Sequence, residues 1–162
     1  MSKKVEQRVV EAAESVTSGV LVGRYDHALD PKKRFTIPSE WRASMGEPAY
    51  VYVMPDRKER CLNLIPPAEM EARLERLREK VLFDPALNAA YQAIGANSEQ
   101  LTLDCQGRIR VCDRLLRFAN LTTTVAMVGS VRMIKLWNPK ALTPEDKIDQ
   151  AALDRALEEA GF

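Results

Sequence analysis

Alternating apolar and polar residues mark two similar regions of the chain. In the first region, Val20–Leu29 is rich in β-forming residues, and Phe35-Thr36-Ile37 alternates again after the turn signal Asp30-Pro31-Lys32-Lys33. Proline suits the second position of such a turn. The pattern predicts a hairpin of two strands joined by a tight turn.

The second region repeats this arrangement around another turn. Leu101-Thr102-Leu103 leads into Asp104–Gly107, and Ile109-Arg110-Val111 leads out of it. Gly107 accepts a positive φ that most residues resist. Lys33 occupies the matching place in the first turn, where we expect the same backbone to be mildly strained.

The two regions belong to a longer internal repeat. When the chain is aligned with itself so that Leu29 falls on Leu103, Leu29–Ile37 matches Leu103–Val111 and shares the core Leu-Asp-x-x-x-Arg-apolar-x-apolar. Two further blocks match in the same order: Val51–Met54 with Val125–Val128, and, after a gap of two positions, Cys61–Pro66 with Met133–Asn138. Three ordered matches indicate a duplication, so each copy should fold alike.

Each predicted hairpin is followed by sequence typical of a short helix. We predict that Ser39 caps a helix over Glu40–Met45 and that Asp113 caps a helix over Arg114–Ala119. Two more strands then complete each copy. A copy of about 45 residues is too small to bury a sufficient core alone. We therefore expect both copies to pack around a pseudo-twofold axis as a closed or nearly closed β-barrel, which hides strand edges.

Helical periodicity appears outside the two copies. The insert between them carries two apolar stripes separated by Asp84-Pro85: Met70, Leu74, Leu77 and Val81, then Leu87, Ala90, Tyr91 and Ile94. A tail helix is predicted from Thr143 onward, with Ile148, Leu153 and Leu157 on one face and Gly161 at its end. The segment 1–16 could fray or form another short helix.

Composition excludes several classes of protein. The three cysteines, Cys61, Cys105 and Cys112, are odd in number and lack CxxC spacing, which argues against a disulfide framework or a structural zinc site. His27 is the only histidine. The apolar runs are short and no signal-peptide core follows Met1, so we expect a cytoplasmic protein without a membrane segment. We also expect no cofactor, no metal and no small-molecule substrate.

The charge distribution is more informative than the net charge of +1. Residues 23–42 carry five basic and three acidic side chains, and residues 101–120 carry four and two. The stretches 67–99 and 139–162 are net acidic. Each basic segment contains one predicted turn, which indicates two anion-facing patches.

The predicted turns carry side chains that bind nucleic acid. Lysine and arginine contact phosphates, arginine also grips guanine with two hydrogen bonds, and glutamine does so with adenine. The first turn offers Lys32, Lys33 and Arg34, and the second offers Gln106 and Arg108. The same Asp-x-x-x-Arg spacing is equally consistent with an ion pair that only fixes the turn, and both roles are compatible.

These residues resemble the MraZ family, part of the wider SpoVT-AbrB group. The resemblance covers roughly residues 20–142. It rests on Tyr25-x-His27-x-Leu29-Asp30-x-Lys32-x-Arg34-Phe35-x-Ile37-Pro38, on Asp104-x-Gln106-Gly107-Arg108-Ile109, on Leu115–Leu121, on Val128-Gly129 and on Ile134-x-Leu136-Trp137. It implies an α+β, mainly β fold: a double-split β-barrel formed by two pseudo-symmetric halves, with a helical insert and a C-terminal helix.

The resemblance also implies a function. Such proteins assemble into ring-shaped homo-oligomers and bind short direct repeats upstream of bacterial cell-division and cell-wall gene clusters through their Asp-x-x-x-Arg segments. Carried onto this chain, the contacts to double-stranded DNA are Lys32, Lys33, Arg34, Gln106 and Arg108, supported by Asp30, Asp104 and Gly107. Arg24, Arg42 and Arg110 are flanking candidates. Lys33 stands where the family usually has glycine, and Cys112 where proline or another turn-favouring residue is common.

The resemblance suggests boundaries along the chain and a place in the cell. We expect an N-terminal extension at 1–19, SpoVT-AbrB-like repeats at 24–71 and 98–141, a helical linker at 72–97 and a helical tail at 142–162. The extension is longer than is typical of the family. The expected location is the cytoplasm, in association with the nucleoid.

Two other functions fit some features of the sequence. Related barrels serve as antitoxins that neutralise a protein toxin and bind their own promoter, and the predicted tail helix is a candidate partner-binding segment. A helix packed on the barrel or on the next subunit is the simpler expectation for that tail. An enzyme is disfavoured: the acidic residues Glu69, Glu71, Glu75 and Glu79 alternate with arginine as solvated pairs, and no nucleophile signature or glycine-rich phosphate loop is present.

Overall fold

The computed structural model describes residues 19–162, so the predicted helix or frayed segment over 1–16 lies outside the described residues. The first copy comprises β1 (Arg24–Ala28), β2 (Arg34–Thr36), α2 (Ser39–Ser44), β3 (Tyr50–Pro55) and β4 (Leu62–Ile65). The second comprises β5 (Glu99–Thr102), β6 (Arg108–Arg110), α5 (Asp113–Phe118), β7 (Thr124–Gly129) and β8 (Ile134–Trp137). The order strand, strand, helix, strand, strand is therefore the predicted one in both copies.

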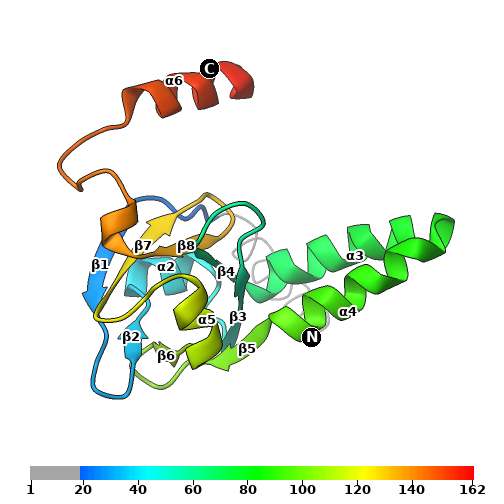
Figure 1. Cartoon of the computed structure of the whole chain (residues 1–162), viewed down its shortest axis with the longest axis horizontal. Coiled ribbons are helices and arrows are strands. Elements are labelled where there is room, and N and C mark those ends of the chain that lie inside the picture. Colours follow the sequence, from blue (N-terminus) through cyan, green and yellow to red (C-terminus); the bar gives the residue numbers. More distant parts are fainter. Residues whose placement is uncertain (1–18) are drawn as a thin grey trace, which may run out of the picture.

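Within residues 19–162, three helices and two 3₁₀ turns lie outside these elements. They are α3 (Pro67–Phe83), a 3₁₀ turn at Pro85–Leu87, α4 (Asn88–Asn97), a second 3₁₀ turn at Pro139–Ala141, and α6 (Gln150–Ala160). The insert thus forms the two predicted helices, and Asp84 accepts a hydrogen bond from Ala86 N where they separate. Figure 1 shows α3 and α4 as a hairpin that projects from one side of the body, and α6 standing apart from it.

The strands form a mixed α+β architecture with two antiparallel sheets. The larger sheet has six strands in the order β1-β7-β8-β4-β3-β5, and the smaller is a ribbon of β2 and β6. Strands of the two copies alternate with each other at both edges of the large sheet, because β1 pairs with β7 and β5 pairs with β3. Neither copy could therefore form these sheets alone.

The strand register has the same symmetry as the internal repeat. Asp26 pairs with Ala126 and Tyr52 pairs with Gln100, and these pairs are equivalent under the alignment that places Leu29 on Leu103. Phe35 faces Ile109 in the ribbon, and Asn63 faces Lys135 at the centre of the large sheet. Residues that correspond in the two copies face each other there, so a pseudo-twofold axis passes through both places.

The predicted hairpins are wrong in one respect. β1 and β2 flank the first turn but do not pair along their length, and the same holds for β5 and β6. Each strand instead pairs with the other copy, because burying Phe35 against Ile109 brings β2 and β6 together on the pseudo-twofold axis. In residues 19–162 the hydrogen-bonded strands leave the large sheet open at β1 and β5, so no closed barrel is found.

The core lies between the two sheets and the helices α2 and α5. It includes Phe35 and Ile109 from the ribbon, Val53 and Leu136 from the large sheet, and Trp41 from α2. A single apolar cluster therefore draws on both copies. Burial of this shared cluster is the main force that holds the interleaved strands together.

The predicted side-chain caps of the short helices are also wrong. Ser39 and Asp113 are the first residues of α2 and α5, where Pro38 and Cys112 take the cap positions without a side-chain hydrogen bond. Asp113 binds Lys33 instead. The tail helix begins at Gln150, capped by Asp149, rather than at Thr143.

Candidate nucleic-acid interface

The first turn is built around the carboxylate of Asp30. Its Oδ1 accepts hydrogen bonds from the backbone N–H groups of Lys32 (2.9 Å) and Arg34 (2.7 Å). Its Oδ2 accepts the Arg34 Nε–H at 2.7 Å. The backbone closes the turn, since Lys33 N donates to Asp30 O and Asp30 N donates to Arg34 O. The carboxylate therefore sets both the loop and the direction of the arginine.

The second turn has the same construction around Asp104. Oδ1 accepts from the backbone of Gln106 and of Arg108, each at 2.9 Å, and Oδ2 accepts Arg108 Nε–H at 2.6 Å. Gly107 N donates to Asp104 O at 3.0 Å. The repeat motif thus specifies one geometry twice, and the ion-pair role of Asp-x-x-x-Arg is real in both turns.

The fourth position of each turn has left-handed backbone. Gly107 has φ of 77° and Lys33 has φ of 59°. The left-handed backbone expected at Lys33 is confirmed, and strain there follows because a side chain in this region places Cβ close to the backbone. A Cβ on Gly107 would come within 2.5 Å of the Arg42 guanidinium carbon, so glycine also leaves room for Arg42.

The arginines of the ribbon share its outer face. Arg34 lies opposite Arg110, and Thr36 lies opposite Arg108. Directly opposed residues and residues two apart point to one side of a strand pair. Phe35 and Ile109 between them point to the core and are buried. The ribbon is therefore apolar inside and cationic outside, with one predicted turn at each end.

Arg34 and Arg108 hold their turns through Nε, which leaves their Nη groups able to bind a ligand. In the described part of the chain, the side-chain hydrogen bonds of Arg34 and Arg108 use only Nε, and these side chains are 29% and 30% exposed. The two Nη groups remain directed donors for a phosphate or a guanine edge. Both sequence interpretations of the motif are therefore compatible in one geometry.

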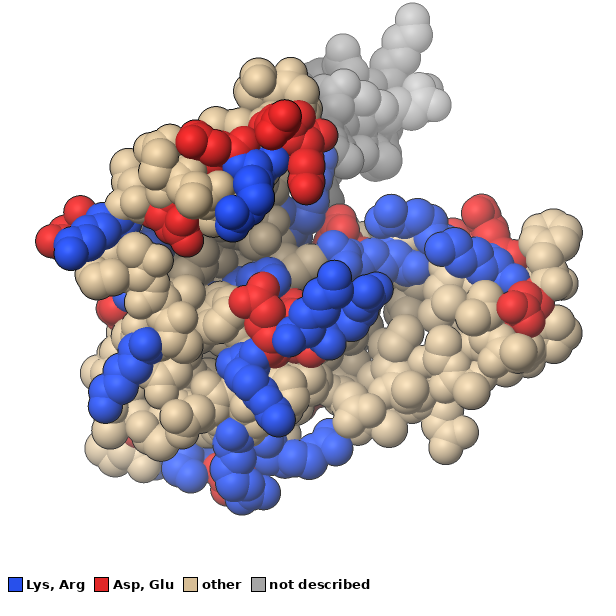
Figure 2. Space-filling model, turned by 45° about the horizontal axis from the view of Figure 1, so that its top comes forward, with Lys and Arg blue, Asp and Glu red and all other residues tan. Residues whose placement is uncertain are grey.

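Further cations gather beside the turns from the opposite copy. Arg110 Nε donates to Lys32 O at 3.1 Å, and Lys33 Nζ lies 3.0 Å from Asp113 Oδ1. Arg42 lies against Gly107 at the other end of the ribbon. Asp113 was not a predicted site residue, since its helix-start position suggested only a cap. Figure 2 shows lysine and arginine side chains gathered on the lower edge of the molecule, where Figure 1 places the ribbon and its turns.

Arg24, the remaining flanking candidate, is not part of this cluster. Its Nε binds Asp26 Oδ1 at 2.9 Å, and its Nη1 donates to Thr143 O at 2.9 Å. Arg24 thus anchors the start of the tail to the β1 edge of the large sheet. The other predicted contact residues lie on the ribbon or its turns, so the structure brings together the residues that the two repeats carried separately.

Replacing Lys33 with glycine should stabilise the fold. Glycine tolerates this φ, and we expect the free energy of unfolding to rise by about 0.5–1 kcal/mol in urea denaturation. The lost Lys33–Asp113 pair is exposed and contributes little. Lys32→Gly is the matched control, because it removes a neighbouring cation without relieving strain. Equal stability of the two variants would contradict the strain at Lys33.

Acid should weaken the turns through their aspartates. The hydrogen bond from the Arg108 backbone N–H, followed by that from its guanidinium, lowers the pKa of Asp104 to about 2, and the same groups of Arg34 lower the pKa of Asp30. A lowered folded-state pKa gives stability that is present above pH about 4 and lost as pH falls toward 2. We expect Asp104→Asn to flatten the pH dependence of the urea midpoint in this window. Parallel profiles for the variant and the parent would refute this role.

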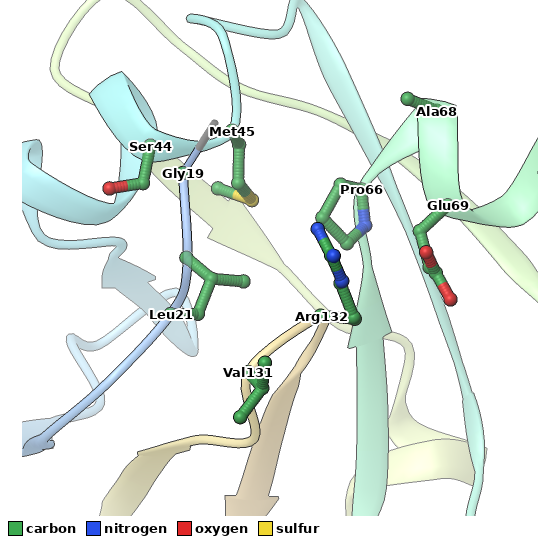
Figure 3. Close-up of a pocket in the computed structure, with 9 residues that line it drawn as sticks. All are labelled: Gly19, Leu21, Ser44, Met45, Pro66, Ala68, Glu69, Val131 and Arg132. Atoms are coloured by element: carbon green, nitrogen blue, oxygen red, sulfur yellow. The ribbon is translucent and has the colours of Figure 1, made fainter. Parts of the chain in front are cut away.

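The described residues also form pockets outside the ribbon and its turns. Figure 3 shows one pocket, in which Leu21, Met45 and Val131 contribute apolar side chains and Glu69 and Arg132 contribute charged ones. Residues 19–162 contain no group of three or more His, Cys, Asp or Glu side chains placed to hold a metal ion. Within the same range, no helix is both long and apolar enough to cross a bilayer.

Several known proteins similar to this chain carry the same name. No family model matches the chain. The transcriptional regulator MraZ of Rhodospirillum rubrum is 35% identical over 130 residues, which cover 75% of this chain and 81% of the relative. MraZ of Corynebacterium jeikeium is 30% identical over 119 residues, covering 74% and 81%, and MraZ of Clostridium acetobutylicum is 26% identical over 145 residues, covering 88% and 100%. With similarity of this degree and extent, the chain belongs to the MraZ family of transcriptional regulators.

Proposed function

We propose that the chain is a sequence-specific DNA-binding regulator that contacts the duplex through the outer face of the β2–β6 ribbon and its two turns. The observation that carries the proposal is the clustering of Arg34, Arg108 and Arg110 on that face. A two-stranded ribbon fits the major groove of B-DNA. The regulator names of the relatives support the same function.

The two ends of the ribbon differ in chemistry. The first turn offers two lysines, Lys32 and Lys33, which suit phosphates, whereas the second offers Gln106, which suits a base edge. Arg34 and Arg108 stand beside them in equivalent geometry. Because the two ends of the ribbon differ, the two orientations of one chain on a duplex are not equivalent. This favours short direct repeats in a promoter over a palindrome, and we propose the promoter of a cell-division and cell-wall gene cluster, including the chain's own.

The finer architecture is part of the proposal. We propose that the ribbon and the large sheet together form a double-split β-barrel, supported by the one core that both sheets share. We retain the repeats at 24–71 and 98–141, the linker at 72–97 and the tail at 142–162, supported by the equivalent strand register of the two copies. We also propose action in the cytoplasm at the nucleoid.

We further propose that the chain assembles with copies of itself into a ring. The support is apolar surface that one chain leaves uncovered: Phe83 on the helical hairpin is 90% exposed, and Leu153 and Leu157 of α6 are exposed as well. Apolar patches of this kind mark interaction surfaces.

The affinity for the chain's own upstream DNA tests the proposed function. We expect the logarithm of the binding constant to fall linearly with the logarithm of salt concentration between about 50 and 200 mM, because bound phosphates release counterions. A scrambled duplex of equal length and composition is the control, and it should bind more weakly at every salt concentration. Equal affinity for both duplexes would contradict sequence-specific binding.

A further inference from the structure

Helix α6 is locally well defined but lacks a partner within the described chain. Asp149 caps its start by accepting a hydrogen bond from Ala152 N at 3.1 Å. Gly161, with φ of 81°, ends it, and Phe162 N donates to Leu157 O. Every residue of the helix is exposed, and Figure 1 shows it clear of the body. Of the two expectations for the tail, packing on the barrel is not seen within residues 19–162, which leaves packing on another subunit.

The exposed helix has an apolar stripe with acids beside it. Leu153 and Leu157, one turn apart, are 41% and 38% exposed. Asp154 and Glu158 follow them in sequence and form an acidic row with the same spacing. An isolated helix of 11 residues is marginally stable in water. The helix therefore needs a surface that covers its leucines and accepts its carboxylates.

Helix α3 offers a surface with the opposite charge. A groove along it is lined by Arg73, Arg76, Lys80, Leu77 and Glu69. Arg73 is paired with Glu69 at 2.9 Å, but no carboxylate of residues 19–162 lies within 4.0 Å of the Arg76 or Lys80 nitrogens. Phe83 extends this face by helical spacing. The groove therefore combines two cations that lack an ion-pair partner within residues 19–162 with the apolar Leu77 between them and Phe83 beyond one end.

The two helices match in spacing as well as in charge. Arg76 and Lys80 are four residues apart, as are Asp154 and Glu158, so each pair spans about 6 Å along its helix. Figure 2 shows a row of basic side chains along α3 and acidic side chains on α6. Two ion pairs could thus form together while Leu153 and Leu157 cover apolar atoms of Leu77 and Phe83.

We propose that α6 of one chain docks on the α3 groove of a second copy. The tail leaves the body at the β1 edge, where Arg24 holds Thr143, whereas α3 contacts β3, toward the opposite edge of the sheet. Arg76 lies a further distance of about 14 Å along α3 from Pro67. This separation favours a second copy over the chain's own groove. The inference rests on the proposed self-assembly and names its contact.

Two charge reversals test the proposed contact by light scattering without DNA. In the first variant, Asp154→Lys/Glu158→Lys, the α6 face and the α3 groove are both basic. In the second, Arg76→Glu/Lys80→Glu, both are acidic. Each variant alone should therefore have a smaller mass than the parent chain. An equal mixture should regain the parent's mass, because each variant then supplies the surface that the other needs. Glu145→Lys/Asp146→Lys is the control with the same charge change before the helix, and it should assemble like the parent.

Several results would overturn the contact. A monomeric parent, or unchanged mass in each variant, would show that α6 does not join copies. If a chain carrying all four substitutions regained the parent's mass while the mixture did not, α6 would dock on the α3 groove of its own chain. Displacement of assembly by a different protein bound to α6 would favour the antitoxin alternative. Because no DNA is present, a failure of the proposed DNA-binding function would leave these outcomes unchanged.

Discussion

Replacing Arg34 or Arg108 with alanine is expected to weaken operator binding by about 1–3 kcal/mol for each substitution, or roughly 5- to 150-fold. Each substitution removes Nη donors from the outer face of the ribbon. Each also leaves an aspartate carboxylate that would repel phosphate in the complex. Gel-shift or fluorescence titration at constant salt measures the change.

Two control variants separate DNA contact from turn formation. Arg57→Ala removes an exposed arginine from the β3–β4 loop and should leave affinity almost unchanged. Asp30→Ala keeps the arginine but removes the acceptor of two backbone N–H groups and should lower the free energy of unfolding more than Arg34→Ala does. If Arg34→Ala lowered stability yet left affinity intact, the arginine would only hold the turn.

Replacing Phe35 with alanine is expected to lower the free energy of unfolding by about 3–5 kcal/mol. Phe35 is 0% exposed and lies opposite Ile109 on the pseudo-twofold axis. The substitution leaves a cavity where the two copies meet, so neither half can compensate by moving alone. Urea denaturation followed by far-ultraviolet circular dichroism measures the loss.

The equivalent position in the second copy provides a matched comparison. Ile109→Ala should cost about 2–5 kcal/mol, whereas Val22→Ala, at a residue that is 61% exposed, should cost less than about 0.5 kcal/mol. A loss at Phe35 no larger than that at Val22 would mean that the ribbon is not packed on the shared core.

Much of the site could be predicted because its geometry is local. Asp30 and Arg34 are four residues apart, and one carboxylate organises the whole turn between them. The same residue types at Asp104 and Arg108 therefore produce the same turn. The left-handed backbone at Lys33 was predictable for the same reason, since Gly107 marks that position in the other copy.

Strand pairing could not be predicted in the same way. The alternation in Phe35-Thr36-Ile37 identifies a strand and its buried face, but it does not identify the neighbouring strand. The pairing of Phe35 with Ile109, which lie in different copies of the repeat, depends on the core as a whole. Local signals at the helix ends were misleading as well, because the Asp113 carboxylate pairs with Lys33 and does not cap its own helix.

The position of α6 depends on surroundings that one chain does not supply. The sequence showed the stripe of Leu153 and Leu157 and the helix end at Gly161, both of which are local. It could not show that the helix would stand clear of the body. A helix with exposed leucines and matched acids is better explained by a contact between copies than by its own fold.

Photo-cross-linking of single protein positions to operator DNA tests the central claim most directly. A benzophenone side chain at position 32 or 106 would stand on one of the two turns, and one at position 100 would stand on an exposed residue of the edge strand β5. We predict DNA adducts from positions 32 and 106 and none from position 100. An excess of unlabelled operator should compete the adducts away. Adducts from position 100 without adducts from either turn would contradict the ribbon as the DNA-binding surface.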